Sequence, residues 1–554
     1  MTAPLFEPPG PGTWDNDSSH CPPSPTRLMR RVASTTMTNA YRDVFEQFGS
    51  PLKTMDVRFV NGKMYRRLVP LVGADKSGPP PPKPVLWLAT RLHPAFRRRE
   101  RTARKVVAER PYLDVVDTWA ATERDEWITA NADLQAIAPA TLDDAALASH
   151  LETLDAHLVA GWTRHHVLHG SDVGPIGDLL AHTNAWGIDA GEVMALLHGA
   201  SPATREAAEH GRRIASALRD AGVDPAGVAS LDAVRAVPAA AAALGAYLDH
   251  HAWRVVTSYD VEGLTCGELP GATCALIRSA AYRSADHADA GATNEEISAV
   301  RGQVPADKRD EFDDLLDSAR CAYGMRDDNG PLTAEWPMGL VRRAFLEAGR
   351  RLAANGRLAD PRHVFELDTP EVSAALAGRP APDADEAIAR AAERATEATM
   401  TPPAVLGPAL PPPDTSPFPP GMRRVMNIVI AAVAVLEVDP TRDVPALSGL
   451  GIGTGVHRGV ARVATDPDVV LEAMEPDDVL VATWTAPTYN AVFSIAGAVV
   501  VQEGGLLCHA AVMARELGIP AVIGCRDAMV AIGDGDLVDV DAGAGEVRIV
   551  ERAG

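Results

Sequence analysis

One histidine of this chain follows a double glycine, in a pattern suited to covalent chemistry at an imidazole. Residues 503–509 read Glu-Gly-Gly-Leu-Leu-Cys-His. Glycine lets the backbone approach a bound group closely, and the N–H groups at a helix start bind anions. A neutral imidazole is a competent nucleophile toward phosphorus. We therefore predict that His509 carries a phosphoryl group, with Gly504 and Gly505 contacting the phosphate.

The flanking residues predict that His509 stands where a strand turns into a helix. Residues 498–501 are Ala-Val-Val-Val, a β-branched run, and residues 510–517 are mostly good helix formers. Arg515 could contact the phosphoryl group, or it could pair with Glu516 and hold the helix. A competing interpretation is a buried histidine whose glycines serve only the turn.

The whole segment resembles a known signature. Gly-Gly-x-x-Cys-His-Ala-Ala-x-x-Ala-Arg-Glu-Leu-Gly-Ile-Pro-Ala-Val is similar to the phosphohistidine motif of the phosphoenolpyruvate-utilising enzymes. The resemblance implies that His509 is phosphorylated and that Cys508 only fills space. It also implies that residues 450–554 form a swivelling domain, with Thr485 at the family's Thr-x-Pro turn.

A second group of residues resembles the central domain of rifampin phosphotransferase-like proteins. The resemblance implies an acceptor site, in which His251 could act as a base on an acceptor hydroxyl and Arg254 could steady the phosphate. Asp260 and Glu268 belong to the same resemblance. A second cluster, which includes Arg326 and Arg342, could line the same cavity. An ion-pair network between helices, or exposed charge at helix ends, explains the same residues equally well.

A histidine-rich stretch raises the question of a metal site. His165 and His169 have the i, i+4 spacing of a metal pair, on a predicted helix that also holds His150, His157 and His166. No third ligand with a glutamate context accompanies them. Histidines of a core or substrate cavity are therefore favoured, and no metal site is predicted.

Composition limits the class of protein. The chain has 554 residues, enough for several domains, and a formal net charge of −22, which disfavours nucleic acid as a partner. The six cysteines lack CxxC spacing and read as reduced thiols. No signal peptide or membrane span is recognised. These features predict a soluble, cytoplasmic protein.

Four regions are expected along the chain. Residues 1–110 are proline-rich and read as irregular, apart from a hairpin at Asn61-Gly62. Residues 111–400 read as a helical, acceptor-like domain, and residues 401–449 as a proline-rich linker and hinge helix. Residues 450–554 alternate as short strands around the His509 helix. The predicted fold class is thus a largely α-helical N-terminal and central region with a C-terminal α/β swivelling domain.

The resemblance also points to parts that this sequence does not show. Neither an ATP-grasp domain nor a pyruvate-handling barrel is recognisable. The chain therefore resembles the acceptor-plus-carrier portion of a split enzyme, closest in layout to the histidine-bearing subunit of phenylphosphate synthase and to the C-terminal two domains of rifampin phosphotransferase. This implies an ATP-dependent, dikinase-type phosphotransferase, with ATP and Mg²⁺ bound by a separate ATP-grasp chain and a small hydroxylated molecule as acceptor. The alternatives are a non-catalytic regulatory or scaffold protein with a dead acceptor site and, third, direct ATP use by this chain.

Overall fold

The computed structural model describes most of the chain. The described residues are 6–17, 21–73, 81–201, 205–282, 291–408, 410, 413–436, 445–464, 470, 473–485 and 489–553. They form two compact units, each assembled from separate segments. The first unit comprises Met1–Ser171, Ser258–Gly263 and Leu332–Asn427. The second comprises Asp172–Thr257, Leu264–Pro331 and Ile428–Gly554.

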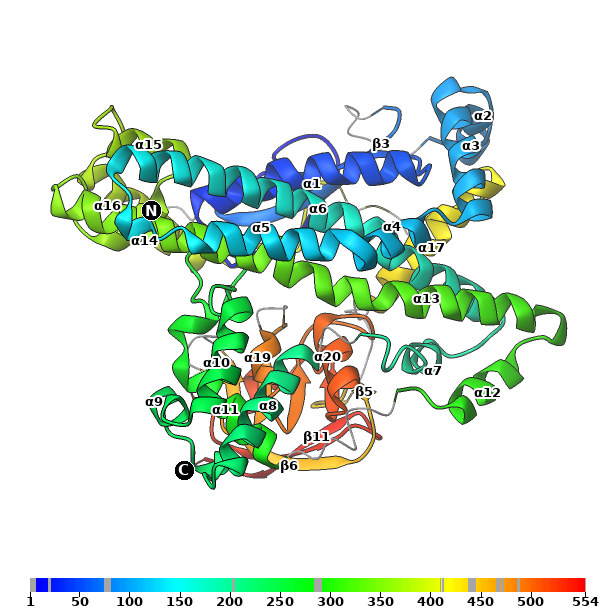
Figure 1. The fold of residues 1–554 in the computed structure, drawn as a ribbon. Helices are drawn as coiled ribbons and strands as arrows, with labels where there is room; N and C mark the ends of the chain where they lie inside the picture. The colour runs from blue at the N-terminus through cyan, green and yellow to red at the C-terminus, as the bar shows by residue number, and fades with distance from the viewer. Residues whose placement is uncertain are drawn as a thin grey trace. The chain divides into compact units, whose positions relative to one another are not determined.

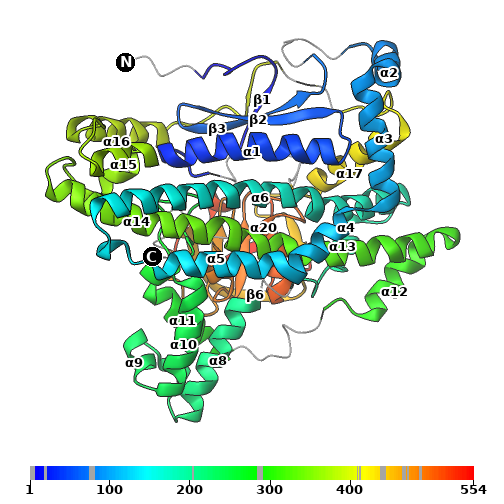
Figure 2. The ribbon, with the colours of Figure 1, turned by 45° about the horizontal axis from the view of Figure 1, so that its top comes forward.

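A four-stranded antiparallel sheet packs against a long helix in the first unit (Figure 2). Its strand order is β2-β3-β1-β4, and its strands are β1 (Trp14–Asn16), β2 (Leu52–Val60), β3 (Lys63–Pro70) and β4 (Val405–Leu406). The predicted hairpin is present, because Asn61 and Gly62 join β2 to β3 with φ of 48° and 73°. Positive φ at both central residues is the requirement of a type I′ turn.

The expectation that residues 1–110 are otherwise irregular is wrong. Residues 27–47 form helix α1 (Arg27–Gln47), whose buried side chains recur at three- and four-residue spacing, among them Leu28, Val32 and Ala40. The Thr26 side chain caps the helix by accepting a hydrogen bond from Met29 N. The prolines before the helix obscured a periodic apolar face that packing then buried.

The other helices of the first unit surround this sheet and helix. They are α2 (Lys83–Leu92), α3 (Pro94–Glu109), α4 (Tyr112–Thr118), α5 (Arg124–Ala136), α14 (Trp336–Ala354), α15 (Thr369–Leu376) and α16 (Ala384–Ala398). Two helices, α6 (Asp144–Ala185) and α17 (Pro420–Leu436), contribute to both units.

The second unit joins helices to a mixed sheet (Figure 1). Its helices are α7 (Ala190–Ala195), α8 (Glu206–Asp220), α9 (Leu231–Arg235), α10 (Pro238–His251), α11 (Pro270–Tyr282), α12 (Asn294–Gln303), α13 (Arg309–Gly330), α19 (Asn490–Phe493), α20 (His509–Leu517) and α21 (Ala528–Ala531). Its strands are β5 (Leu450–Ile452), β6 (Val456–Ala464), β7 (Val479–Ala482), β8 (Ala498–Val501), β9 (Ala521–Ile523), β10 (Leu537–Asp541) and β11 (Glu546–Glu551).

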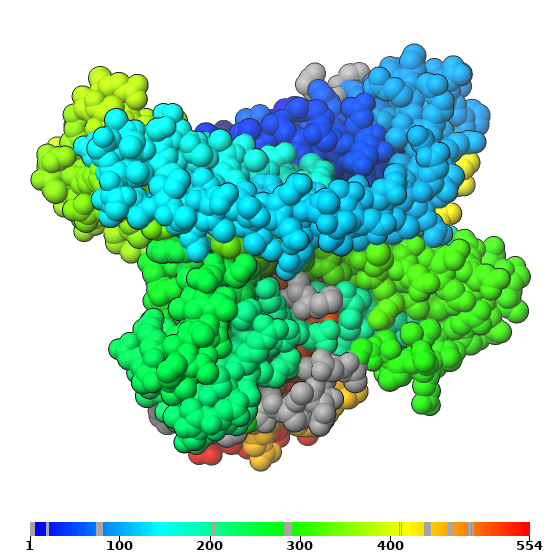
Figure 3. All heavy atoms as spheres, viewed as in Figure 1, coloured from blue at the N-terminus to red at the C-terminus, as the bar shows by residue number. Residues whose placement is uncertain are grey.

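The sheet of the second unit has the order β11-β10-β6-β7-β8-β9-β5, in which the run from β6 to β9 is parallel. Both faces of its centre are buried. On β8, Val499 and Val501 join the core shared with α8, α10 and α11, while Ala498 and Val500 join a core on the other face. A parallel strand buried on both faces is expected to be apolar throughout, which explains the Ala-Val-Val-Val run. Figure 3 shows the green atoms of α8 to α11 in front of this domain.

The fold class predicted from the sequence is confirmed: helices dominate the N-terminal and central regions, and a C-terminal α/β domain follows. The four region boundaries stay a prediction. The helical stretch of residues 111–400 is divided between the two units, and residues 437–444 of the expected hinge lie outside the described residues. Within the described chain, no helix combines the length and apolarity needed to cross a membrane.

Candidate functional site

His509 is the first residue of α20, at the end of the loop that leaves β8. The loop begins by extending the sheet, because Gln502 N donates to Ala482 O and Glu503 N to Thr483 O. It is then tied to the end of α17 by hydrogen bonds from Gly505 N to Leu436 O (2.9 Å) and from Leu507 N to Val435 O (2.7 Å). The predicted strand–turn–helix geometry is therefore present around His509.

The two glycines have different structural uses. Gly504 has φ of 117°, which disfavours side chains, and a Cβ placed there would lie 2.8 Å from Cys508 Sγ. The N–H of Gly505 is already used by Leu436 O, so contact with a phosphate stays a prediction for this residue. Burial raises the pKa of the Cys508 thiol, which keeps it protonated and fits a space-filling role.

We expect Gly504→Ala to destabilise the protein by about 1–3 kcal/mol, the usual cost of one strained backbone residue. The new methyl group meets Cys508 Sγ, and the positive φ strains any L side chain. Urea unfolding of the full chain measures the loss. Gly543→Ala is the matched control, since its nearest atom would lie at an ordinary 3.5 Å. Equal stability of the two variants would refute the steric argument.

The His509 imidazole is held by a hydroxyl and an aromatic edge. Its Nδ1 lies 3.0 Å from Thr485 Oγ1, and its ring meets Phe493 edge-on with centroids 5.4 Å apart. Burial, and after it the charge of Arg326, lower the pKa of His509 to about 3. The ring is therefore neutral at pH 7, the form in which one nitrogen keeps a lone pair.

The pKa of His509 can be checked by titration. We expect its NMR resonance to show no protonation near pH 6.5 and a midpoint well below it, near about 3. Because the folded pKa lies below the unfolded value, His509 contributes stability above pH 6.5 that is lost as the pH falls toward 3. A midpoint at or above 6.5 would contradict the burial and charge described here.

Arg515 lies inside the second unit and is engaged with the protein. Its Nη1 donates to Tyr323 Oη (3.0 Å), and its Nη2 donates to Leu506 O (3.1 Å). It thus braces α20 against α13 and against the glycine loop. Glu516 instead accepts from Gly199 N at 3.1 Å. This geometry favours the structural role for Arg515 over phosphate contact.

The structure places Arg326 where its charge acts on His509, which the sequence did not reveal. It was grouped with the acceptor cluster, yet it lies on α13 of the second unit, where its charge acts on His509. Its Nη1 is 3.9 Å from Asp172 Oδ1. Thr485 was also missing from the predicted site residues, although its Thr-x-Pro position was a usable signal.

Three members of the predicted acceptor cluster lie along one chain turn of the second unit. Arg254 N donates to His251 O, and Arg254 O accepts from Cys266 N, which brings the Glu268 turn alongside. The Glu268 carboxylate accepts from Thr265 N and Thr265 Oγ1, both at 2.9 Å, and so caps its own turn.

Two further predicted members, Asp260 and Arg342, belong to the first unit and have structural partners there. Asp260 accepts from Thr26 N (2.7 Å) and Thr26 Oγ1 (2.8 Å) at the start of α1, and burial raises its pKa to about 6. Arg342 is buried and donates to Glu262 O (2.7 Å). For both residues, the role in an acceptor site stays a prediction.

The histidines of α6 contact the protein around them. His157 Nε2 lies 2.8 Å from Asn131 Oδ1, and His166 Nδ1 lies 2.7 Å from Trp162 O. The rings of His165 and His169 are 4.5 Å apart and nearly perpendicular. Burial lowers the pKa of His157 to about 4.

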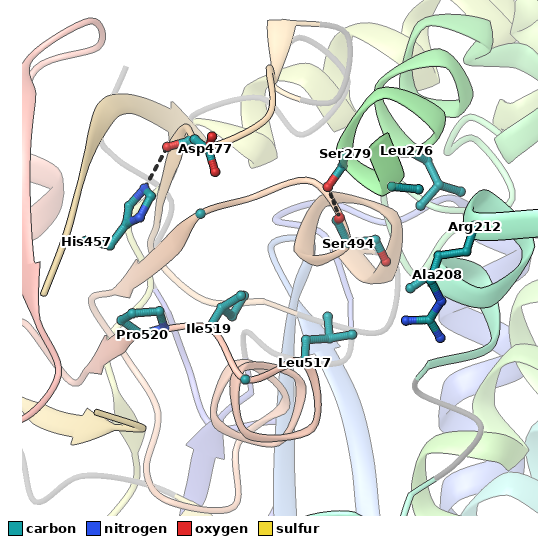
Figure 4. Close-up of a pocket in the computed structure, with 13 residues that line it drawn as sticks. Ala208, Arg212, Leu276, Ser279, His457, Asp477, Ser494, Leu517, Ile519 and Pro520 are labelled. Atoms are coloured by element: carbon teal, nitrogen blue, oxygen red, sulfur yellow. Dashed lines mark hydrogen bonds between the residues drawn. The ribbon is translucent and has the colours of Figure 1, made fainter. Parts of the chain in front are cut away.

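A cavity of about 320 Å³ lies elsewhere in the second unit (Figure 4). It is bordered by Arg212, Ser279, His457, Asp477, Ser494 and Leu517. Leu517 ends α20, eight residues and roughly 12 Å along the helix from His509. The cavity is therefore separate from the histidine site.

Comparisons with known proteins agree with this arrangement. Residues 474–545 match the family described as "PEP-utilising enzyme, mobile domain". Rifampicin phosphotransferase of Streptomyces sviceus is 30% identical over 330 residues, covering 56% of this chain and 34% of that protein. Uncharacterized phosphotransferase YvkC of Bacillus subtilis is 36% identical over 120 residues, covering 22% of this chain and 14% of that protein. Phosphoenolpyruvate synthase of Escherichia coli K12 is 41% identical over 102 residues, covering 18% and 13%.

The C-terminal α/β domain, in which His509 begins α20, is therefore a mobile domain of the phosphoenolpyruvate-utilising type. Over these matched stretches, the chain is similar to phosphoenolpyruvate-utilising enzymes and to proteins named as phosphotransferases. The 330-residue match exceeds the length of the C-terminal domain, so the similarity to rifampicin phosphotransferase reaches into the helical region. The chain spans about a third or less of the length of these relatives.

Proposed function

We propose that this chain is the histidine-bearing portion of a phosphotransferase, in which His509 receives a phosphoryl group and passes it to a small hydroxylated acceptor. The observation that carries the proposal is the His509 geometry. A neutral imidazole stands at the start of α20, its Nδ1 faces Thr485, and the charge of Arg326 acts on it. Relatives named as phosphotransferases support the same reaction class.

The residues suggest how the two transfers proceed. In the tautomer whose Nδ1–H donates to Thr485 Oγ1, Nε2 of His509 keeps the lone pair that attacks phosphorus, and the P–O bond to the donor breaks. The acceptor oxygen then attacks the same phosphorus, its proton leaves to a base, and the P–N bond breaks. The positive charge of Arg326 stabilises the phosphoryl oxygens in both steps.

The donor is proposed to be ATP with Mg²⁺, bound by a separate ATP-grasp chain. No Gly-x-x-x-x-Gly-Lys-Ser/Thr loop occurs in the sequence, so the phosphate-binding residues of a P-loop are not supplied here. The six cysteines are free thiols, which supports a reducing, cytoplasmic setting. The acceptor is proposed to bind in the helical region, where the predicted site includes His251 and Arg254.

A chase experiment tests the transfer to an acceptor. The full chain is phosphorylated with labelled ATP and its ATP-grasp partner, separated from nucleotide, and mixed with phenols, alcohols and water controls. We expect label to leave His509 rapidly for one class of hydroxylated acceptor. Label that leaves at the rate of hydrolysis with every acceptor would overturn acceptor transfer and favour the regulatory alternative.

The full chain is required in this test. Truncation to the histidine domain would remove α8, α10 and α11, whose buried side chains share one hydrophobic core with Val499 and Val501 of β8. Loss of activity in a truncated chain would therefore report unfolding rather than a missing acceptor site.

A further inference from the structure

We propose that Glu206, His210 and His251 form a binding site for a divalent transition-metal ion, with zinc as the ion that the ligand set fits best. Their ligand atoms all lie within 4.8 Å of one another. Among the described residues, this is the sole group of three or more such side chains gathered closely enough to hold a metal ion. The inference does not rest on the phosphorylation of His509, although it shares His251 with the predicted acceptor site.

Two neighbouring helices of the second unit supply the three side chains. Glu206 and His210 are four residues apart on α8, a spacing that places both on one face of a helix. His251 is the last residue of α10, which packs along α8 (Figure 1). A metal ion bound here would therefore join the beginning of α8 to the end of α10.

An unsatisfied nitrogen on His251 points to a ligand. The His251 side chain is 7% exposed, and its Nε2 has no hydrogen-bond partner among the described residues. A buried polar atom without a partner costs about 1–3 kcal/mol, so a structure retains one when something else satisfies it. A metal ion would do so, because neutral imidazole nitrogen is a common zinc ligand.

The surroundings hold the His251 ring in place. It stacks on Tyr247 with centroids 4.6 Å apart and planes inclined by 20°, and the His210 ring meets it at 5.6 Å. Tyr247 Oη in turn lies 3.2 Å from Cys266 Sγ. This packing fixes the orientation of one ligand before any ion binds.

The charges near the site are compatible with a cation. Burial lowers the pKa of both histidines, with Arg254 contributing in each case, so both imidazoles are neutral ligands at pH 7. The Arg254 guanidinium opposes a cation, whereas the Glu206 carboxylate offsets it. Two imidazoles and one carboxylate are also the ligand set of many zinc sites that keep a fourth position for water.

The proposal changes what His251 can do. A metal ion on Nε2 would take one of the two His251 nitrogens away from the role of free base that the acceptor-site prediction gives to this residue. The proposal also replaces the expectation that the chain holds no metal. It does not involve the α6 histidines, for which no metal site is proposed.

Zinc binding by the full chain is the test. The chain is stripped with a chelator, and zinc is titrated in competition with a metallochromic indicator. We expect one tight equivalent per chain and a rise in Tm on binding. Glu206→Gln and His210→Gln should each weaken binding by at least about tenfold, the lower end of the loss that even outer-shell changes cause.

Controls separate this site from adventitious binding. Glu209→Gln on α8 and His250→Gln on α10 change neighbouring side chains of the same types and should bind zinc as the unaltered chain does. Cobalt in place of zinc should give the intense visible bands of a four-coordinate site, and these should disappear in His210→Gln. Absence of a tight equivalent, or equal binding by all four variants, overturns the proposal. Metal-free Tm values that match the unaltered chain show that each variant is folded.

Discussion

Replacing His509 by glutamine will abolish incorporation of label from ATP into this chain. Glutamine approximates the size of the imidazole but has no nucleophilic nitrogen, so the P–N bond cannot form. Loss of a covalent nucleophile costs on the order of 10⁶ in rate in well-studied enzymes, which places the variant below detection. The measurement is label retained on the chain after incubation with the ATP-grasp partner.

The control uses the other histidine of the same domain. His457 lies on β6, where its Nε2 is 2.8 Å from Asp477 O, and it does not line the His509 site. His457→Gln should therefore take up label at the normal rate. If His509→Gln takes up a normal amount of label at any position, the proposed role of His509 as the phosphorylated residue is wrong.

Replacing Arg326 by glutamine will slow phosphorylation of His509 by about 10²–10³, the usual cost of losing one group that stabilises transition-state charge. The guanidinium lies on α13 of the same unit, and its charge already lowers the pKa of His509. The phosphoryl group brings negative charge to the same place. Single-turnover label uptake measures the effect.

A second readout distinguishes charge from folding. Without the Arg326 charge, the pKa of His509 should rise, although burial keeps it below 6.5. Arg326→Lys should keep part of the rate. Arg301→Gln is the control, because Arg301 pairs with Asp313 at 2.8 Å on the surface. A normal rate together with an unchanged His509 pKa in Arg326→Gln would show that this arginine acts elsewhere.

The sequence predicted those elements of the fold that depend on the conformational preferences of neighbouring residues. Asn61-Gly62 gave the hairpin because both residues accept positive φ. The Ala-Val-Val-Val strand, the glycine turn and α20 followed from short-range preferences for strand, turn and helix. Helix α1 was missed, because flanking prolines masked an apolar face that only packing makes evident.

Long-range partners were outside the reach of such reasoning. The candidate acceptor residues look alike as charged groups near helix ends. Yet Asp260 binds Thr26, the N-cap residue of α1, Arg342 binds the backbone of Glu262, and Arg326 acts on His509. The sequence around a charged residue does not indicate which distant residue its side chain will contact. The spacing of Glu206 and His210 was equally uninformative until α10 brought His251 beside them.

The sequence by itself predicted the candidate nucleophile, His509, and determined the turn that presents it. The Gly-Gly-x-x-Cys-His pattern predicts the turn and the helix start at His509 from fewer than ten residues, because backbone strain and helix initiation are local. Tertiary structure alone decided what surrounds the imidazole: Thr485 on Nδ1, Phe493 against the ring, and the Arg326 charge. These contacts join residues far apart in the chain, and burial and electrostatics act through space rather than along the sequence.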